Sequence, residues 1–126
     1  MRSRPGEGAS KQMSVKSKRV YDAAAPGDGY RVLIDRMWPR GVSRQRAQLD
    51  EWARELAPSS ELRKWFHHDP ERFDEFRSRY REELRERRPL LEELRRRARD
   101  GPVTLLYAAR DREHNDAVVL EELLSG

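Results

Sequence analysis

Cysteine is absent from the 126 residues, which excludes disulfide bonds, thiolate nucleophiles and zinc sites built on cysteine. Long apolar runs are absent as well: no segment approaches the ~20 residues that span a bilayer, and no apolar signal-peptide stretch follows the first residues. There is no glycine-rich phosphate loop, no G-x-S-x-G and no H-E-x-x-H motif. We therefore expect a soluble cytoplasmic protein without membrane association, and no motif names a cofactor.

The composition limits how many hydrophobic cores the chain can build. Hydrophobic residues make up 36% and charged residues 40% of the sequence. A chain of this length buries roughly two-thirds of its unfolded surface, which suffices for one core covered by strongly amphipathic helices. We expect residues 1–12 to form a disordered arm because they have almost no apolar content. Met13 is a candidate natural start, and residues 13–126 should form a single α/β domain.

The net charge of +4 and pI of about 9.7 point to an acidic partner, but the excess charge is local. Residues 1–19 hold six of the 27 basic groups and one of the 23 acidic groups. The rest of the chain then carries 21 basic and 22 acidic groups and is close to neutral. Nucleic acid is therefore a less favoured partner than the pI alone indicates.

Hydrophobic patterning and capping residues predict short strands that alternate with helices. The two clearest strands cover residues 30–37 and 102–108, and the second is apolar throughout, as in a strand buried on both faces. Helix starts are predicted at Ser43, at Ser59 or Ser60, and at Asp69-Pro70. The remaining predicted elements are a strand over 15–21, a second helix after Pro89 that ends at Gly101, and a last helix that includes 117–124.

This alternation predicts a small, layered α/β fold with a mainly parallel, short sheet packed by helices. Ligands in such folds bind in the crevice at the carboxyl ends of the strands. Two polar clusters follow the two clearest strands and should converge there. They contain Asp35, Arg36, Trp38 and Arg40 after the first strand, and Tyr107, Arg110, His114 and Asn115 after the second.

The residue types in these clusters indicate an anion site with a proton-transfer group. Arg36 and Arg40 suit bidentate contact with a phosphate or carboxylate. Asp35 or His114 could move a proton, and the neighbouring Arg36 is expected to keep Asp35 ionised and favour a base role. Further contacts to substrate are assigned to Trp38, Tyr107, Arg110 and Asn115.

Structural alternatives exist for most of these residues. Asp35 and Arg36 could pair with Arg112 or Glu113 and only tie the loops together. Trp38 could be a lid over the core rather than a stacking wall, and Asn115 could be a helix cap. If the residues only hold loops together, the chain would be a non-catalytic interaction module whose crevice is filled by its own side chains.

The histidines leave a further choice open. His68 could reach the crevice as a second proton-transfer group, or lie in solvent beside the capping Asp69. His68, His114 and Asp35 are types that bind metals, but their spacing is not diagnostic of a metal site, and we assign no metal ligands.

A second surface bears on nucleic acid. Residues 77–99 contain ten arginines and five glutamates, and they could contact RNA or DNA together with the N-terminal arm. The one aromatic residue in this segment, Tyr80, belongs to its apolar stripe. A solvated helix face with internal ion pairs is therefore favoured.

Several long segments resemble one bacterial family. KRVYD, DGYRVLIDRMWPRGVS, LDEWARELAPSSELRKWF, HDPERF and GPVTLLYAARDREHNDAVVLEELL occur in this order over residues 18–124. They are similar to the domain of unknown function 488 family, in its YeaO-like branch. The resemblance implies a small cytoplasmic α/β protein from a family whose biochemical activity is not established. Its polar signature falls on Asp35, Arg36, Trp38, Pro39, Arg40, Gly41, His68, Asp69, Tyr107, His114 and Asn115.

The chain departs from that family pattern at three positions. His67 stands where relatives commonly have Gly, and Arg110 where Lys is frequent. Asp116 stands where relatives often have His, which weakens any scheme with a second histidine there. We expect a small-molecule or nucleotide site with a possible catalytic role, with nucleic-acid association or an interaction module as alternatives. Cofactor and oligomeric state stay open.

Overall fold

The computed structural model describes residues 14–125 of the chain. The predicted N-terminal arm over residues 1–12 lies outside the described residues. Within the described part, no helix is both long and apolar enough to cross a bilayer.

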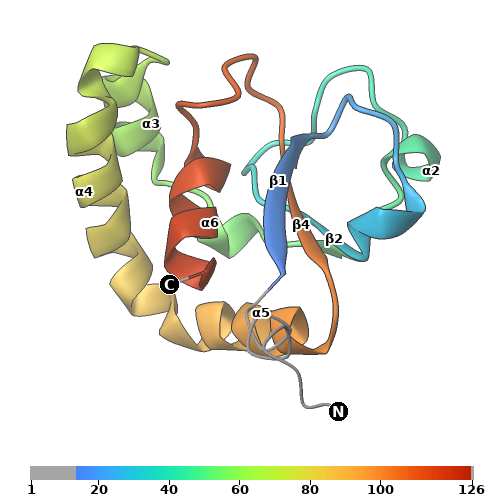
Figure 1. The fold of residues 1–126 in the computed structure, drawn as a ribbon. Coiled ribbons are helices and arrows are strands. Elements are labelled where there is room, and N and C mark those ends of the chain that lie inside the picture. The colour runs from blue at the N-terminus through green and yellow to red at the C-terminus, as the bar shows by residue number, and fades with distance from the viewer. Residues whose placement is uncertain (1–13, 126) are drawn as a thin grey trace.

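A four-stranded parallel sheet forms the centre of the fold (Figure 1). Its strands are β1 (Val15–Arg19), β2 (Tyr30–Leu33), β3 (Glu51–Trp52) and β4 (Val103–Tyr107), in the order β1-β4-β2-β3. The central strand β4 pairs with β1 on one side and β2 on the other, so β2 and β4 end at the same edge. The predicted fold class and the parallel pairing of the two clearest strands are confirmed.

Five α-helices are present in the described residues, and local sequence explains where the early ones begin. Ser43 and Ser59 each accept a hydrogen bond from the backbone N–H three residues later, which caps α2 and α3 as predicted. The chain between α3 and α4 turns through a short 3-10 helix, Pro70–Arg72, with Asp69 as its cap. The helices are α2 (Arg44–Ala47), α3 (Ser60–Phe66), α4 (Phe73–Leu84), α5 (Arg88–Asp100) and α6 (Asp116–Ser125).

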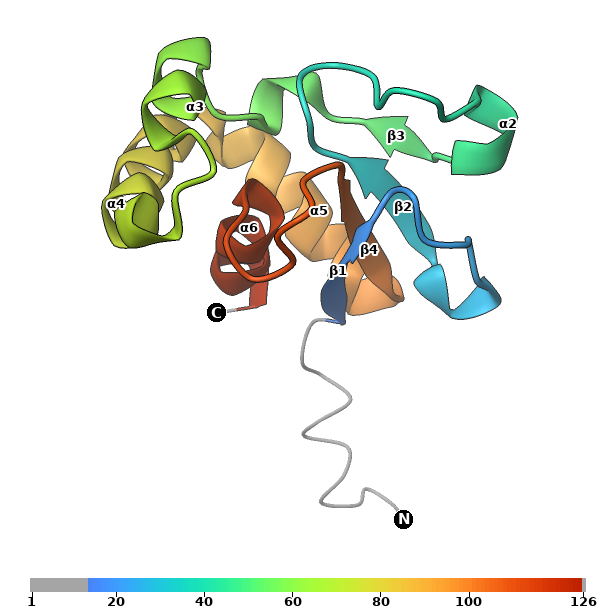
Figure 2. The same cartoon turned by 90° about the horizontal axis from the view of Figure 1, so that it is seen from above.

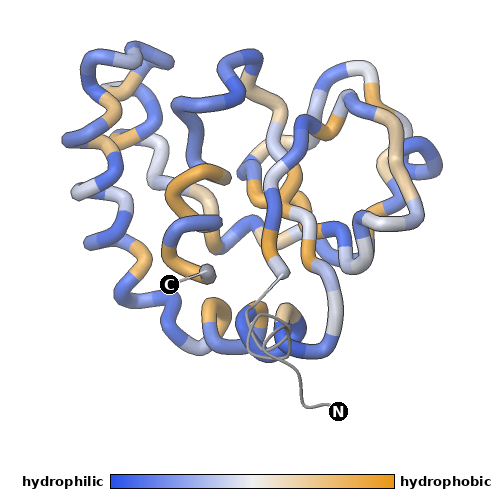
Figure 3. The backbone as a smooth tube through the Cα atoms, in the orientation of Figure 1, coloured by the Kyte–Doolittle hydropathy of each residue, from blue (hydrophilic) through white to orange (hydrophobic). Residues whose placement is uncertain are grey.

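The two faces of the sheet are covered differently. Figure 2 shows α3 to α6 on one side of the sheet, and α2 with long loops on the other. Side chains alternate along each strand, so Val32 and Leu105 join the larger core under the helices, while Leu33 and Leu106 join a smaller cluster with Ala47. The apolar residues of β4 and α6 lie at the centre in Figure 3, with hydrophilic segments around them.

Three local predictions differ from the structure. The strand predicted over 30–37 ends at Leu33, although Ile34 still donates its N–H to the carbonyl of Leu106 at 3.1 Å. The segment after Ala47, for which the sequence predicts no definite element, contains the short edge strand β3, which a period-2 pattern cannot reveal in two residues. Gly101 follows α5 in an extended conformation with φ of 177°, rather than the left-handed one of a typical C′ glycine, and leads directly into β4.

One tight contact explains a glycine at the start of β2. Gly29 has a φ of +65°, and a Cβ atom there would lie 2.2 Å from the carbonyl oxygen of Pro102. That oxygen accepts the N–H of Tyr30 at 2.9 Å. Only glycine lets the two strands begin this close together.

A buried charged cluster lies beside this contact. Asp28 and Arg31 are 1% and 4% exposed, and a guanidinium nitrogen of Arg31 lies 2.5 Å from the Asp28 carboxylate. Lys18 adds hydrogen bonds of 3.0 and 3.1 Å to the same carboxylate. The Arg31 guanidinium also donates to the carbonyl of Ala47, which ties α2 to the sheet.

Candidate functional site

Asp35 marks the carboxyl end of β2 and is fixed by both neighbouring strands. Its side chain accepts the backbone N–H of Ala108, just past the end of β4, at 2.9 Å. Its backbone carbonyl accepts the indole N–H of Trp52 on β3 at 2.7 Å. The carboxyl group is therefore held at the edge where the sequence predicted a site.

The loop after β4 is held by Asp111 and delivers a second carboxyl group. The Asp111 carboxylate accepts the backbone N–H groups of Glu113 and His114 at 2.8 and 3.0 Å. Asn115 donates its amide to the Asp111 carbonyl and accepts the N–H of Val118, so it caps α6. The helix then begins at Asp116, whose carboxyl group lies near enough to that of Asp35 for the charge of Asp35 to raise its pKa.

The two carboxyl groups open into a cavity of about 310 Å³ at this edge of the sheet. The residues that line it come from α3, α4 and α6 and from loops, including the loops that follow β2 and β4. The lining residues are Asp35, Arg36, Met37, Trp38, Pro39, Arg40, Ala57, Pro58, Arg63, Phe66, His68, Phe76, Ala108, Ala109, Asn115 and Asp116.

The carboxyl pair holds its protons more tightly than ordinary aspartates do. Burial raises the pKa of Asp35, although the hydrogen bond from Ala108 acts in the opposite direction. Burial also raises the pKa of Asp116 well above its ordinary value, and the neighbouring charge of Asp35 raises it further. Two neighbouring carboxyl groups cannot both ionise cheaply, which adds to the effect of burial on the pKa of Asp116.

One part of the sequence-based expectation changes. Arg36 was expected to keep Asp35 ionised, but burial has the largest effect and raises the pKa of Asp35. The charges that lower this pKa are those of Arg63 and His68. Arg36 instead extends toward the carbonyl of Pro58, at 3.5 Å. A base role for Asp35 stays a prediction.

Positive charge gathers around the cavity on exposed side chains. Arg36 and Arg40 come from the loop after β2, and Arg63 comes from α3. All three are solvent-exposed. The site therefore combines two carboxyl groups of raised pKa with three guanidinium groups.

Aromatic rings form much of the apolar wall. Phe66 and Phe76 stack with their centroids 4.3 Å apart. Trp38 donates its indole N–H to the carbonyl of Val42 at 2.6 Å and meets the Trp52 ring edge-on at 5.3 Å. Trp38 thus lines the cavity and also covers the smaller core cluster, so both interpretations of this residue have support.

The structure brings together six of the nine site residues named from the sequence. Asp35, Arg36, Trp38, Arg40, His68 and Asn115 line the cavity. His114, Tyr107 and Arg110 do not: the His114 ring nitrogen lies 2.9 Å from Asp111 and its ring meets Phe73 edge-on, Tyr107 is buried in the core, and Arg110 is exposed. A functional role for any of the nine stays a prediction.

Two structural alternatives raised by the sequence can now be compared with the geometry. Arg112 pairs with Asp22 at 2.8 and 3.0 Å, so it does not tie Asp35 or Arg36 to its loop. Asn115 is a helix cap, and both ends of its amide are used within the loop and helix. Among residues 14–125, no three His, Asp or Glu side chains are grouped so that they could hold a metal ion.

Sequence reasoning missed Asp116, Arg63 and the two phenylalanines of the wall. Asp116 was noted only as a departure from a family pattern, although it is the first residue of a helix that starts at the predicted edge. Arg63, Phe66 and Phe76 lie on helices that are distant in sequence from both strands. Helical periodicity showed which residues of α4 are apolar, but not which of them border a cavity.

Comparison with known proteins places the chain in a family. Residues 14–126 match the family described as "Inactive DUF488-N3 subclade". The chain belongs to this DUF488 family. It is 45% identical over 116 residues to the uncharacterized protein Rv3073c of Mycobacterium tuberculosis, covering 92% of this chain and 98% of the relative. It is 44% identical over 112 residues to the uncharacterized protein YeaO of Escherichia coli, covering 89% and 97%.

No solved structure is a significant match to this member of the DUF488 family. The family match and the 44% identity to YeaO confirm the resemblance predicted from the sequence. The relatives are uncharacterized proteins, so they assign no role to the cavity.

The carboxyl pair should make stability depend on pH. A carboxyl group whose pKa is higher in the folded than in the unfolded state stabilises the folded protein while it is protonated. This stabilisation is complete below the ordinary aspartate pKa of 3.8 and is lost as pH rises through the folded pKa. Asp116→Asn removes this proton and keeps a hydrogen-bond donor for Asp35. At alkaline pH, we expect the free energy of unfolding of the variant to be about 0.5–2 kcal/mol larger than that of wild type.

Urea unfolding of wild type and Asp116→Asn between pH 4 and pH 9 tests this expectation. The difference between their free energies of unfolding at each pH cancels the titration of all other groups. The difference in unfolding free energy should grow in favour of Asp116→Asn as pH rises. A difference that is constant with pH would show that the pair does not hold its proton in the folded state.

Proposed function

We propose that the protein binds an anionic small molecule of the nucleotide class in the cavity at the carboxyl ends of β2 and β4. The observation that carries this proposal is the position of Arg36, Arg40 and Arg63 around one cavity. Guanidinium groups give strong, bidentate hydrogen bonds to phosphate and carboxylate oxygens. These three side chains are exposed at the cavity, where a ligand can reach them.

The size and walls of the cavity support a ligand with a flat ring. Its volume of about 310 Å³ is at the lower end of the range for small-molecule sites, roughly 300–1,000 Å³. Trp38, Phe66 and Phe76 supply aromatic surface, and aromatic side chains stack on nucleobases in many binding sites. A nucleotide combines a ring for this wall with a phosphate for the arginines.

Binding rather than turnover is the role we propose. The subclade to which the chain belongs is described as inactive. Of the residues predicted to be catalytic, His114 lies outside the cavity lining and is paired with Asp111. Burial raises the pKa of Asp35, and the His68 side chain is exposed.

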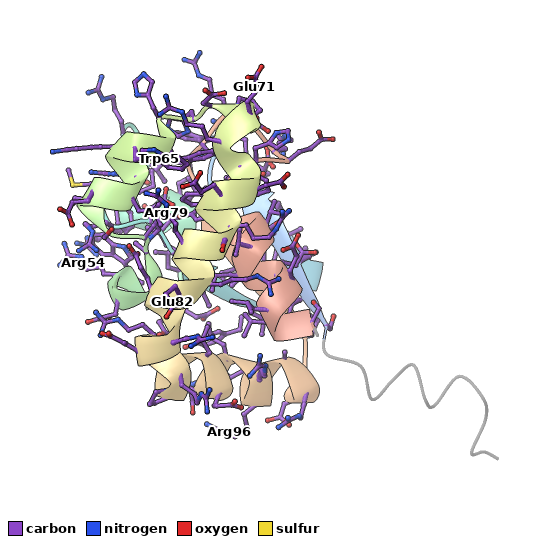
Figure 4. All side chains as sticks on the ribbon, turned by 90° about the vertical axis from the view of Figure 1, so that its left-hand side faces the viewer. Arg54, Trp65, Glu71, Arg79, Glu82 and Arg96 are labelled. Atoms are coloured by element: carbon purple, nitrogen blue, oxygen red, sulfur yellow. The ribbon has the colours of Figure 1, made fainter. Side chains whose placement is uncertain are left out.

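The two alternatives have less support. At least seven of the ten arginines between residues 77 and 99 form ion pairs with neighbouring acids, which favours a solvated helix face over a nucleic-acid surface. Figure 4 shows acidic and basic side chains intermixed on this side of the molecule. A non-catalytic interaction module predicted a crevice filled by its own side chains, whereas the cavity is open.

A thermal-shift and calorimetric screen tests the proposal with inorganic phosphate, ribose 5-phosphate and AMP as probes. A probe at a hundred times its dissociation constant stabilises the folded state by about 2.7 kcal/mol, which moves the unfolding midpoint by several degrees. Each charge-assisted hydrogen bond is worth about 1.5–3 kcal/mol. The variant Arg36→Ala/Arg40→Ala should therefore bind a phosphate-bearing probe at least tenfold more weakly than wild type.

Arg85→Ala is the matched control, because Arg85 is exposed where α4 meets α5, makes a long ion pair of 3.7 Å to Glu82 and does not line the cavity. It should bind as wild type does. Wild-type affinity in the double variant, or no binding of any probe to the wild type, would contradict the anion site.

A further inference from the structure

We propose that a second cavity, at the edge strand β3 and the helix α2, binds a guanidinium group such as the side chain of an arginine. Figure 2 shows β3 at the edge of the sheet with α2 beside it. The cavity has a volume of about 240 Å³, and its lining residues are Trp38, Arg44, Leu49, Asp50, Glu51 and Trp52. This proposal does not depend on the anion site, although Trp38 lines both cavities.

Two indole rings give this cavity a rigid aromatic wall. Their centroids lie 5.3 Å apart, and the ring planes meet at 73°. Trp38 donates its indole N–H to the carbonyl of Val42 at 2.6 Å, and Trp52 donates its own to the carbonyl of Asp35 at 2.7 Å. Because both N–H groups are used within the protein, the rings are held in place and offer a ligand their π surface, which attracts cations.

Guanidinium groups of the protein itself lie over both rings. The guanidinium carbon of Arg54 is 4.1 Å from the centroid of Trp52, and that of Arg44 is 5.0 Å from the centroid of Trp38. Arg54 covers its ring from outside the cavity lining, whereas Arg44 is part of the lining. Each ring is therefore in an environment in which a guanidinium stacks.

Two carboxylates border the same cavity and have acceptor capacity left. One oxygen of Asp50 accepts the backbone N–H of Arg31 at 2.8 Å, and one oxygen of Glu51 accepts the hydroxyl of Tyr30 at 2.8 Å. Within residues 14–125, neither carboxylate forms an ion pair. The second oxygen of each carboxylate can therefore accept from a cationic donor.

A guanidinium group uses both parts of this lining. Its flat face stacks on an indole ring while the N–H groups in its plane donate to carboxylate oxygens. A compact ammonium can pair with the carboxylates but has no flat face. A quaternary ammonium can lie against the rings but has no N–H to donate. The carboxylates also outnumber the one basic side chain of the lining, Arg44, so the cavity favours a cation.

Arg44 is the residue of this chain that competes with such a ligand. Its side chain is exposed on α2, lies over Trp38 and lines the cavity without an ion pair to Asp50 or Glu51. Its positive charge opposes the entry of a second cation. Arg44→Ala should therefore strengthen the binding of a guanidinium ligand about threefold or more. Unchanged or weaker binding would overturn this role of Arg44.

A titration of the full chain with methylguanidinium, followed by the indole N–H signals in two-dimensional NMR, tests the proposal. The signals of Trp38 and Trp52 should shift together, with a dissociation constant in the millimolar range because the probe is small. Trp65 is the internal control. Arg72 and Arg79 lie over its ring at 5.3 and 4.4 Å, but it lines neither cavity, so its signal should stay in place.

Comparison probes and variants separate guanidinium recognition from general attraction of cations. Methylammonium and tetramethylammonium should each bind about fivefold or more weakly than methylguanidinium. The variant Asp50→Asn/Glu51→Gln keeps an acceptor for the backbone N–H and for the tyrosine hydroxyl but removes both charges. It should weaken methylguanidinium about fivefold or more. Glu55→Gln is the matched control, because Glu55 is exposed and does not line the cavity, and it should bind as wild type does.

Two larger probes identify the source of the guanidinium. L-arginine and N-acetyl-L-argininamide present the same group with and without free amino and carboxylate groups. If the blocked amide binds at least as tightly as methylguanidinium, an arginine within a peptide fits the site. If only the free amino acid does, the ligand is a small molecule. Either result supports a guanidinium site.

Four results would overturn the guanidinium site. These are the absence of any shift at Trp38 and Trp52, an equal shift at Trp65, equal affinity for methylammonium, and unchanged affinity in Asp50→Asn/Glu51→Gln. None of them bears on the anion site, whose test uses phosphate-bearing probes and a variant of Arg36 and Arg40.

Discussion

Asp28→Ala is expected to lower the free energy of unfolding by about 3–5 kcal/mol. Asp28 is 1% exposed and is the carboxylate to which Arg31 and Lys18 donate. Arg31 is itself only 4% exposed, so removal of Asp28 leaves a buried guanidinium without its counter-charge. The cost is large because a single charge is left inside the protein, and not because the intact pair is strongly stabilising.

Asp22→Ala is the matched control for this measurement. Asp22 pairs with Arg112 through two hydrogen bonds of 2.8 and 3.0 Å, but 57% of the Arg112 side chain is exposed. Exposed pairs of this kind contribute about 0–1 kcal/mol. Urea unfolding of the two variants at neutral pH should therefore separate them by several kcal/mol, and equal losses would contradict the buried-charge explanation.

The same pair of variants predicts an acid effect. Burial alone would raise the pKa of Asp28, but hydrogen bonds from a backbone N–H and from Lys18 and Arg31 lower it well below the ordinary value of 3.8. A lowered folded pKa gives stability that is present above 3.8 and is lost as pH falls toward the folded pKa. Wild type should lose stability below pH 4 more steeply than Asp28→Ala, which has no carboxyl group to protonate.

This cluster shows why part of the fold was predictable and part was not. The strand over Val103–Tyr107 is apolar at most positions, and that local pattern was sufficient to predict a buried strand. Asp28 lies between the predicted strands 15–21 and 30–37 and was named in no sequence prediction, because its role depends on Lys18 and Arg31 folding around it. No local pattern distinguishes a buried carboxylate from a solvated turn residue.

The position of the candidate site followed from topology alone. Once β2 and β4 were predicted to be parallel neighbours, Asp35 and the loop before α6 had to meet at one edge. Which side chains of that loop face the cavity was not predictable. The His114 ring pairs with Asp111 outside the cavity lining, and Asn115 caps α6. The conformation of the loop is set by hydrogen bonds that sequence spacing does not reveal.

The carboxyl pair is the feature that sequence reasoning missed most clearly. Asp35 and Asp116 are 81 positions apart in the printed sequence, and each was interpreted separately. Only the fold shows that they line one cavity, where burial raises the pKa of both groups and the charge of Asp35 raises that of Asp116 further.

Phe76→Ala is expected to lower the free energy of unfolding by about 3–5 kcal/mol. Phe76 is 1% exposed, stacks on Phe66 at 4.3 Å and lies 5.5 Å from the ring of Tyr80. It also lines the cavity, so the space left by its ring adds to an existing opening that the surrounding helices cannot close. Leu90→Ala is the control, because Leu90 is 36% exposed on α5, and its loss should stay near 1 kcal/mol or below.

The position of Phe76 in both the core and the cavity wall ties this stability effect to ligand binding. Phe76→Leu fills part of the space and should recover much of the stability, but it removes the flat surface on which a base would stack. We therefore expect Phe76→Leu to weaken AMP by about fivefold or more while ribose 5-phosphate is little affected, since base–aromatic stacking is worth about 1–3 kcal/mol. Equal weakening of both probes would mean that Phe76 acts only through the fold, whereas selective loss of AMP would place the base against α4.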